Sequence, residues 1–247
     1  MKIYLACSKT MTEKKPGKDI PVSIPLFQKE AENIVEELNR YSAAELQEIL
    51  HVNGRLAIVN KKRFMDFFLP DNALPAIFSY TGTAYKALNV SDFNSAELES
   101  ANRRILIGSF LYGLLRPFDK IHPYRLEGNV ELPSNNHESM FEFWKPLLTD
   151  VFIKTVKDDD GILVNLASAE LCQLMDWKKV CNELTVFTPT FRINTNGVLK
   201  TVAMYSKMCR GAMTRWIIKN NISKPEHLDD FSYQGFKSEG NLNFVLA

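Results

Sequence analysis

The seven-residue run from 161 to 167, GILVNLA, constrains the fold of this chain more than any other segment. It is continuously apolar apart from Asn165, it is rich in branched side chains, and it lies between the acidic turn 158–160 and Ser168. A strand of this kind is covered on both faces, as in parallel or mixed sheets flanked by helices. The run therefore predicts an α/β architecture.

The remaining segments supply the other elements that such a fold needs. Short apolar runs predict further strands at 2–6, 76–79, 105–110, 184–191 and 199–205. Apolar residues at helical spacing, and one capping box that begins at Ser42, predict helices at 28–39, 42 onward, 57–67, 140–156, 169–175 and 207–220. Because no repeat or linker interrupts them, we expect one α/β domain over 1–247, a mixed sheet flanked by helices, with α+β as the alternative.

Composition excludes several classes of protein. Hydrophobic residues make up 45% and charged residues 24% of the 247 residues, which is typical of a globular chain and not of a disordered or coiled-coil one. The longest uncharged stretch, 72–85, has 14 residues, whereas a membrane-spanning helix needs about 20. The first ten residues, MKIYLACSKT, lack the apolar core of a signal peptide. We therefore expect a cytoplasmic protein with no membrane partner.

The residues that bind metals and cofactors are scattered along the chain. The four cysteines and four histidines show no C-x-x-C, H-x-x-x-H or H-E-x-x-H spacing. The glycine and serine motifs of dinucleotide-binding proteins, P-loop NTPases and α/β-hydrolases are also absent. We predict no metal site and no cofactor.

Charge is distributed unevenly, although the net charge is only +1. The segment 184–225 contains no Asp or Glu but seven basic residues: Arg192, Lys200, Lys207, Arg210, Arg215, Lys219 and Lys224. A protein whose net charge is close to zero can still have one strongly basic surface, which can bind an anion. The alternative is that these side chains only solvate a surface.

The segment 44–63 resembles a helix-hairpin-helix, a module that grips nucleic-acid backbones. Val52 takes the central hydrophobic position and Ala57 the anchor in the second helix, but the flanking glycines are replaced by His51 and Asn53. Free amides at a helix N-terminus bind phosphate, and Asn tolerates left-handed backbone almost as Gly does. The candidate contacts are Val52, Asn53, Gly54, Arg55, Lys61, Lys62 and Arg63. An ordinary helical hairpin is the alternative.

The predicted helix around 205–217 carries a second basic group, Lys207, Arg210 and Arg215. Lys207, Arg210, Gly211 and Thr214 fall on the side opposite the apolar residues of that helix. A glycine inside a helix costs about 1 kcal/mol relative to alanine, so Gly211 indicates that something bulky approaches the backbone there. A phosphate chain and a neighbouring helix both fit, and the adjacent cations favour the phosphate.

A third candidate group is a pair of arginines. Arg116 and Arg125 lie in the segment 112–125, whose prolines predict a stiff loop, and they bind either an anion or the internal acids Asp119 and Glu127.

Polar side chains follow two of the predicted strands. Ser8, Lys9 and Thr10 follow the first, and Asn165 and Ser168 lie in and after the buried one. Ligands of open α/β sheets bind beyond the carboxyl ends of strands, so Lys9 is a reactive amine or an anion clamp. For Ser168 the structural alternative is that it caps the next helix.

Together these segments resemble the YaaA family, also called DUF328 or UPF0246. The resemblance runs along nearly the whole chain and rests on KIYLACSKT, LYGLLRPFD, PYRLE, FEFW, LVNLAS and YSKMCRGAMTRWII. Where the family typically shows S-P-A-K-T, this chain has Ala6-Cys7-Ser8-Lys9-Thr10, so Lys9 and Thr10 remain but the preceding turn differs.

The resemblance implies the unusual "cantaloupe" α/β fold, with a positively charged cleft and a helix-hairpin-helix that bind duplex and branched DNA. It also implies a bacterial protein of the peroxide stress response, associated with limiting free iron and oxidative DNA damage.

Three hypotheses of function follow. In the first, a protein without enzymatic activity binds DNA through the helical hairpin and a cleft lined by Lys9, Arg116, Arg125, Lys207 and Arg210. In the second, an enzyme acts on a nucleotide or DNA with Lys9 as nucleophile or clamp beside Asn165, Ser168 and Arg116. Direct iron binding, the third, is disfavoured because no cluster of His and carboxylate ligands is present. The sequence leaves the oligomeric state open, with a monomer favoured.

Overall fold

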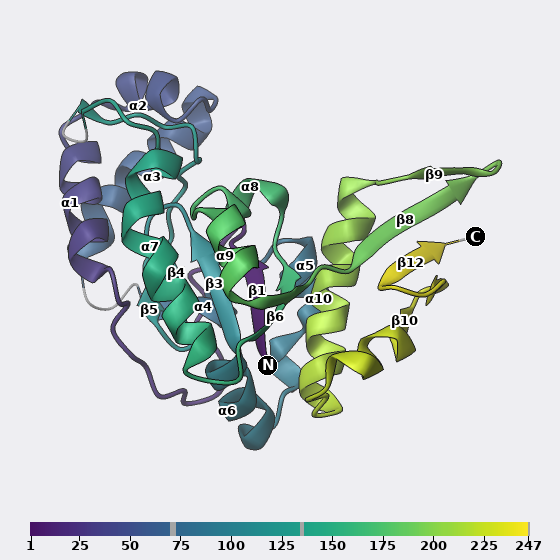
Figure 1. The fold of residues 1–247 in the computed structure, drawn as a ribbon. Helices are drawn as coiled ribbons and strands as arrows, with labels where there is room; N and C mark the ends of the chain where they lie inside the picture. The colour runs from purple at the N-terminus through teal and green to yellow at the C-terminus, as the bar shows by residue number, and fades with distance from the viewer. Residues whose placement is uncertain (70–72, 134–135, 247) are drawn as a thin grey trace.

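The computed structural model describes residues 1–69, 73–133 and 136–246 and has a five-stranded mixed sheet at its centre (Figure 1). The strand order is β4-β3-β1-β6-β7. β1 pairs in parallel with β3 and β6, β6 pairs in parallel with β7, and β4 is the antiparallel edge. The bounds are β1 (Lys2–Ala6), β3 (Ile105–Ser109), β4 (Gly113–Leu115), β6 (Ile162–Leu166) and β7 (Thr185–Phe187). The predicted α/β class and the buried strand β6 are confirmed.

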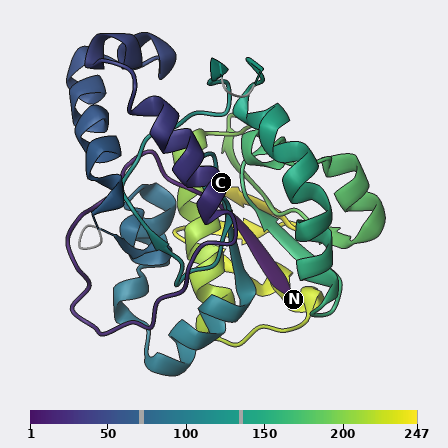
Figure 2. The same cartoon turned by 90° about the vertical axis from the view of Figure 1, so that its left-hand side faces the viewer.

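Helices cover both faces of this sheet (Figure 2). α7 (Met140–Lys157) and α9 (Trp177–Glu183) pack on one face, where the Tyr4 ring of β1 lies 5.0 Å from Phe152 and 6.2 Å from Trp177. α5 (Thr83–Leu88), α6 (Ser95–Arg104) and α10 (Ala203–Lys219) pack together on the other side. This covering explains why β1 and β6 are apolar apart from Lys2 and Asn165.

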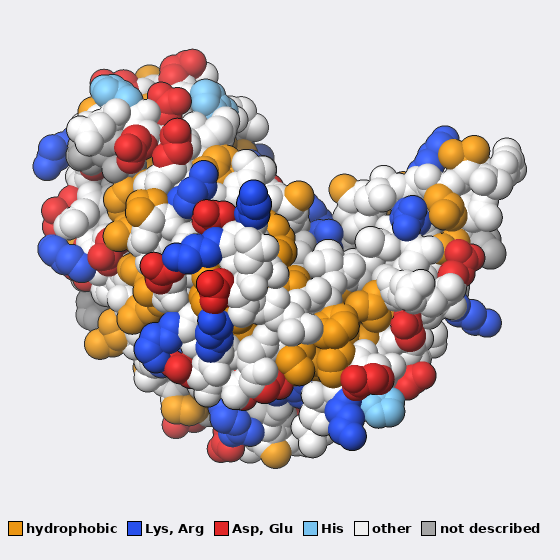
Figure 3. Space-filling model, in the orientation of Figure 1, with side chains coloured by type: hydrophobic (Ala, Val, Ile, Leu, Met, Phe, Trp, Pro, Cys, Tyr) orange, Lys and Arg blue, Asp and Glu red, His pale blue; other side chains and the backbone are white. Residues whose placement is uncertain are grey.

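A second five-stranded sheet lies beside α10, in the order β10-β11-β12-β8-β9. Its bounds are β8 (Thr190–Thr195), β9 (Val198–Lys200), β10 (Ser232–Tyr233), β11 (Phe236–Ser238) and β12 (Asn243–Leu246). The β8–β9 hairpin projects from the body, and Figure 3 shows a broad hollow between it and the remainder of the molecule. In Figure 1, β1 runs upward from the N label, so its carboxyl end is the end that lies nearer to this hollow.

The remaining elements are short or lie at one end of the molecule. The capping box is confirmed, since the Ser42 hydroxyl accepts from the Glu45 amide at 3.3 Å and the Glu45 carboxylate accepts from the Ser42 amide at 2.7 Å. The elements are α1 (Gln28–Leu38), α2 (Ala43–Ile49), α3 (Gly54–Met65), α4 (Ala76–Ser79), α8 (Ala169–Cys172), β2 (Leu74–Pro75) and β5 (Lys120–Ile121). No helix in the described residues is long and apolar enough to cross a membrane.

Four predictions of local structure are wrong in part. The run 184–191 is not one strand, because β7 ends at Phe187 in the central sheet and β8 begins at Thr190 in the second sheet. The run 76–79 forms the short helix α4 and not a strand, because a brief apolar segment buried all round has no periodicity that separates the two. In the segment 199–205, strand β9 ends at Lys200 and α10 begins at Ala203. The stiff loop 112–125 contains the short strands β4 and β5.

Candidate functional site

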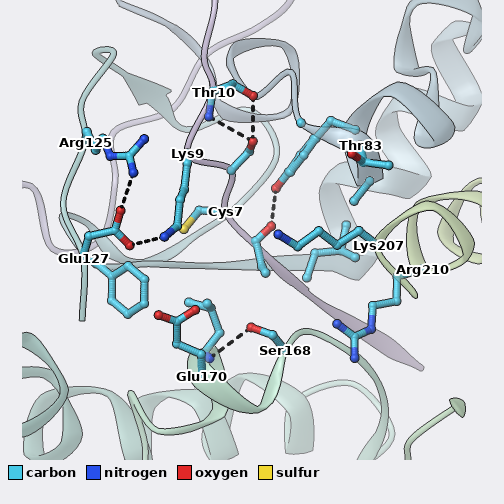
Figure 4. Close-up of a pocket in the computed structure, with 18 of the residues that line it drawn as sticks. Cys7, Lys9, Thr10, Thr83, Arg125, Glu127, Ser168, Glu170, Lys207 and Arg210 are labelled. Carbon is cyan, nitrogen blue, oxygen red and sulfur yellow. Dashed lines mark hydrogen bonds and ion pairs between the residues drawn. The ribbon is translucent and has the colours of Figure 1, made fainter. Parts of the chain in front are cut away.

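A cavity of 320 Å³ lies beyond the carboxyl ends of β1 and β6 (Figure 4). Because β1, β3 and β6 are parallel, their last residues meet at one edge of the sheet, and the segments that follow form the wall. Six stretches of chain contribute: 5–10, 82–85, Phe110, 124–127, 166–171 and the α10 residues Lys207 and Arg210. Ser8, Lys9, Thr10 and Ser168 are thus brought together at this edge.

One acidic residue, Glu127, forms ion pairs with two of the basic residues of the cavity. The Lys9 ammonium lies 2.7 Å from one carboxylate oxygen of Glu127, and the Arg125 guanidinium lies 3.1 Å from the other. Glu127 is buried, whereas Lys9 is 56% exposed. Pairing with a carboxylate offsets much of the positive charge of both basic residues. Arg125 therefore pairs with the internal acid Glu127, which was the alternative to anion binding in the sequence analysis.

Lys207 and Arg210 differ from that pair because no acid among residues 1–69, 73–133 and 136–246 forms an ion pair with them. They lie one turn apart on α10, and Figure 4 shows both on the side of the cavity opposite Glu127. Neither has an ion-pair partner within the part of the chain that the structure describes. Burial lowers the pKa of the Arg210 guanidinium below its usual range, as expected for a charge that the protein leaves uncompensated. These two cations are available to an anion.

Gly211 has a packing role. A Cβ at this position would lie 1.8 Å from the carbonyl oxygen of Ala84, so α5 crosses α10 at van der Waals contact there. The neighbouring-helix explanation is correct, and the phosphate explanation is wrong for this glycine. Thr214, placed by the helical wheel on the polar side, is also fully buried and donates its hydroxyl to the Arg210 carbonyl at 2.9 Å.

Two other predicted DNA-binding residues, the cleft residue Arg116 and the α10 residue Arg215, lie elsewhere. Arg116 pairs with the buried Asp119 at 2.9 Å and donates to the Ile24 carbonyl at 3.2 Å. Arg215 pairs with Asp92 and lies 5.7 Å from the centre of the Phe93 ring. Neither lines the cavity in the described structure, so the basic residues of the sequence do not form one surface.

The helical hairpin is formed by α2 and α3, with a turn unlike the one expected. The left-handed residue is His51, with φ 51°, whereas Asn53 is extended. The Asn53 side chain accepts from the Leu56 amide at 3.0 Å, so it caps α3 and occupies an amide that a phosphate would otherwise use. Val52 is partly buried, and Gly54 begins α3.

The cations of this hairpin are divided between internal and exposed positions. Lys61 donates to the Asn39 carbonyl at 2.6 Å, and Arg63 lies 3.9 Å from Glu13. Arg55 and Lys62 are exposed. Among the residues that the structure describes, this group does not line the cavity, so any DNA contact it makes is a separate one.

Sequence reasoning missed several residues of the cavity wall, among them Thr83, Tyr85 and Glu170. The first two belong to α5, a helix of six residues that is too short for a periodic pattern to predict. Glu170 lies two residues after Ser168, in the first turn of α8, so its nearness to a strand end was the available signal. Ser168 caps this helix through the Leu171 amide, as its structural alternative stated. No group of three His, Cys, Asp or Glu suited to a metal occurs in the described residues.

The fold and the site define a one-domain α/β protein with a partly charged cavity at the carboxyl edge of a mixed sheet. The chain belongs to the family described as "Peroxide stress protein YaaA", whose model matches residues 1–242. It is 45% identical over 237 residues to a UPF0246 protein of Phocaeicola vulgatus, covering 96% of this chain and 93% of that relative. It is 43% identical over 244 residues to a UPF0246 protein of Bacteroides thetaiotaomicron, covering 98% and 95%. The resemblance inferred from the motifs is confirmed.

Within a peroxide stress family, the state of the thiols can be tested directly. Burial raises the pKa of Cys7 and of Cys209 to about 12 and that of Cys172 to about 11, so all three are protonated at neutral pH. Since the thiolate is the reactive form, we expect these three to react with Ellman's reagent at pH 7.5 at least about tenfold more slowly than the exposed Cys181. Cys181→Ala should abolish the fast phase. A fast phase that persists in this variant would contradict the assignment.

Proposed function

We propose that this protein binds DNA with little base specificity, as part of the response that limits iron-dependent oxidative damage. The observation that carries the proposal is the pair Lys207 and Arg210, two cations for which the described residues provide no acidic partner, in the wall of a cavity beside the hollow of the molecule (Figures 3 and 4). Phosphates supply most of the affinity in such binding. Lys9 and Arg125 are proposed as weaker contacts, and the exposed Arg55 and Lys62 as a second contact on α3.

The double variant Lys207→Ala/Arg210→Ala tests this proposal. We expect it to weaken binding to every DNA sequence alike, by about tenfold or more, because two phosphate contacts are lost. The slope of log affinity against log salt should flatten by about 1.8, since each contact contributes about 0.9. Fluorescence anisotropy of labelled duplex, single-stranded and four-way-junction DNA, at several salt concentrations, measures both quantities.

The matched control removes the same charge elsewhere. Lys178→Ala/Lys237→Ala replaces two exposed lysines that do not line the cavity, and it should change the salt slope by less than about half as much. If the two double variants behave alike, net charge and not this site determines the binding.

An enzyme acting on a nucleotide or DNA is the second candidate function. The observation in its favour is that the Lys9 amine lies 2.7 Å from the buried Glu127, a carboxylate placed to take its proton inside a cavity. Borohydride should then trap Lys9 covalently on DNA that carries an abasic site, and Lys9→Arg should not be trapped. The absence of an adduct in the wild-type protein would contradict a nucleophilic role of Lys9.

A further inference from the structure

We propose that the cavity binds one nucleoside monophosphate unit, either a free mononucleotide or a single unpaired nucleotide of DNA. Binding of an unpaired nucleotide of DNA rests on the proposed function, whereas binding of a free mononucleotide does not.

The dimensions of the cavity require a small occupant. Its volume of 320 Å³ falls at the lower end of the range for small-molecule sites, about 300 to 1,000 Å³. A duplex, whose major groove alone is about 12 Å wide, cannot enter it. The phosphates of paired DNA therefore reach only the mouth, and the interior is left for one nucleotide.

The floor of the cavity suits a flat aromatic group. Phe110, Tyr85 and Tyr124 line it, together with leucine side chains. The fold already uses both tyrosine hydroxyls, because Tyr85 donates to the Ala6 carbonyl at 3.0 Å and Tyr124 lies 2.7 Å from the Ser109 hydroxyl. The floor thus presents carbon surface to a ligand, as base-binding sites do.

Charge is divided across the cavity. Lys207 and Arg210 lie on one side, and Glu127 and Glu170 on the other (Figure 4). For the Glu170 carboxylate, the described part of the chain provides no hydrogen bond or ion pair. Glu127 is already paired with Lys9 and Arg125, so Glu170 is the carboxylate that is left for a ligand. A nucleotide has a phosphate for the cations at one end and base N–H groups for a carboxylate at the other.

This division predicts a preference among bases. Glutamate accepts from the exocyclic amino group that cytosine, adenine and guanine carry and thymine lacks. We therefore expect dCMP and dAMP to bind at least about fivefold more tightly than dTMP or inorganic phosphate. The variant Glu170→Gln should reduce this difference in affinity between dCMP or dAMP and dTMP.

The experiment compares two DNA molecules and two forms of the protein. A fully paired duplex is set beside the same duplex with one bulged 2-aminopurine, which emits more strongly when it is unstacked. With the wild-type protein, the bulged duplex should bind about fivefold more tightly, and its emission should at least double. Thr83→Trp, which places an indole in the cavity, should lose both effects and still bind paired duplex. Val22→Trp adds the same group at an exposed site and should keep them.

A competition experiment on the wild-type protein needs no variant to fold. Excess dCMP should abolish the preference for the bulge, whereas equal inorganic phosphate should not. If neither the bulge nor any mononucleotide is preferred while paired duplex binds, the inference fails and the DNA-binding proposal stands. If mononucleotides bind but no DNA does, the cavity assignment stands in its free form and the DNA-binding proposal fails.

Discussion

Replacing Gly211 with alanine is expected to lower the free energy of unfolding by about 3 kcal/mol. The added Cβ would meet the Ala84 carbonyl oxygen at 1.8 Å, and a backbone atom in a packed helix cannot move aside as a flexible side chain can. Alanine gains about 1 kcal/mol of helix propensity over glycine, but overpacking costs about 1 to 3 kcal/mol and more where backbone is struck. Because α10 carries Lys207 and Arg210, the variant should also disturb the cavity.

Gly54→Ala is the matched control, since it adds the same methyl group to another helix. The nearest atom there is Gln47 Oε1 at 3.0 Å, at the end of a flexible side chain. We expect Gly54→Ala to be neutral or up to about 1 kcal/mol more stable than the wild type. Urea unfolding followed by circular dichroism measures both variants. Equal stability of the two would show that α5 does not pack on α10 at this distance.

Replacing Arg116 with alanine is expected to lower the free energy of unfolding by about 2 to 3 kcal/mol. Asp119 is 1% exposed, and removing the guanidinium leaves its carboxylate buried without a charged partner. Arg103→Ala is the control, because Arg103 forms only an exposed pair with Glu99 and should cost under about 1 kcal/mol.

A double-mutant cycle separates this structural role from a role in DNA binding. Arg116→Ala/Asp119→Ala should cost less than the sum of the single changes, by at least about 1 kcal/mol, because the two residues interact directly. At a temperature where Arg116→Ala is folded, its affinity for DNA should equal that of the wild type. A loss like that of Lys207→Ala/Arg210→Ala would instead place Arg116 in the binding surface.

Local patterns in the sequence were sufficient to predict the three inner strands of the central sheet, β1, β3 and β6, and the edge where the cavity lies, but not the edge strand β4. The apolar run 161–167 required a covered strand, and Lys9 and Ser168 followed strands whose ends had to meet. The orientation of individual arginines could not be predicted in the same way. Arg215 is paired with Asp92, which lies 123 positions earlier, and no local pattern indicates so distant a contact.

The role of Gly211 shows the same limit. A glycine beside two cations is equally compatible with a phosphate and with a crossing helix, and α5, the helix that crosses, is too short to be predicted. Tertiary packing, which the sequence does not display, decided between the two.

The pairing of β1 has a consequence for the synthesis of the chain. Ile3 pairs with Ile105, and Lys2 with Leu163, so β1 is flanked by two strands that are made much later. At roughly 5 to 20 residues per second, β1 waits about 5 to 20 s for β3 and longer for β6. Until then it has two open edges and apolar faces, the state in which nascent strands associate wrongly. Production of this protein should therefore depend on chaperones that hold the segment of β1, more than its compact final structure suggests.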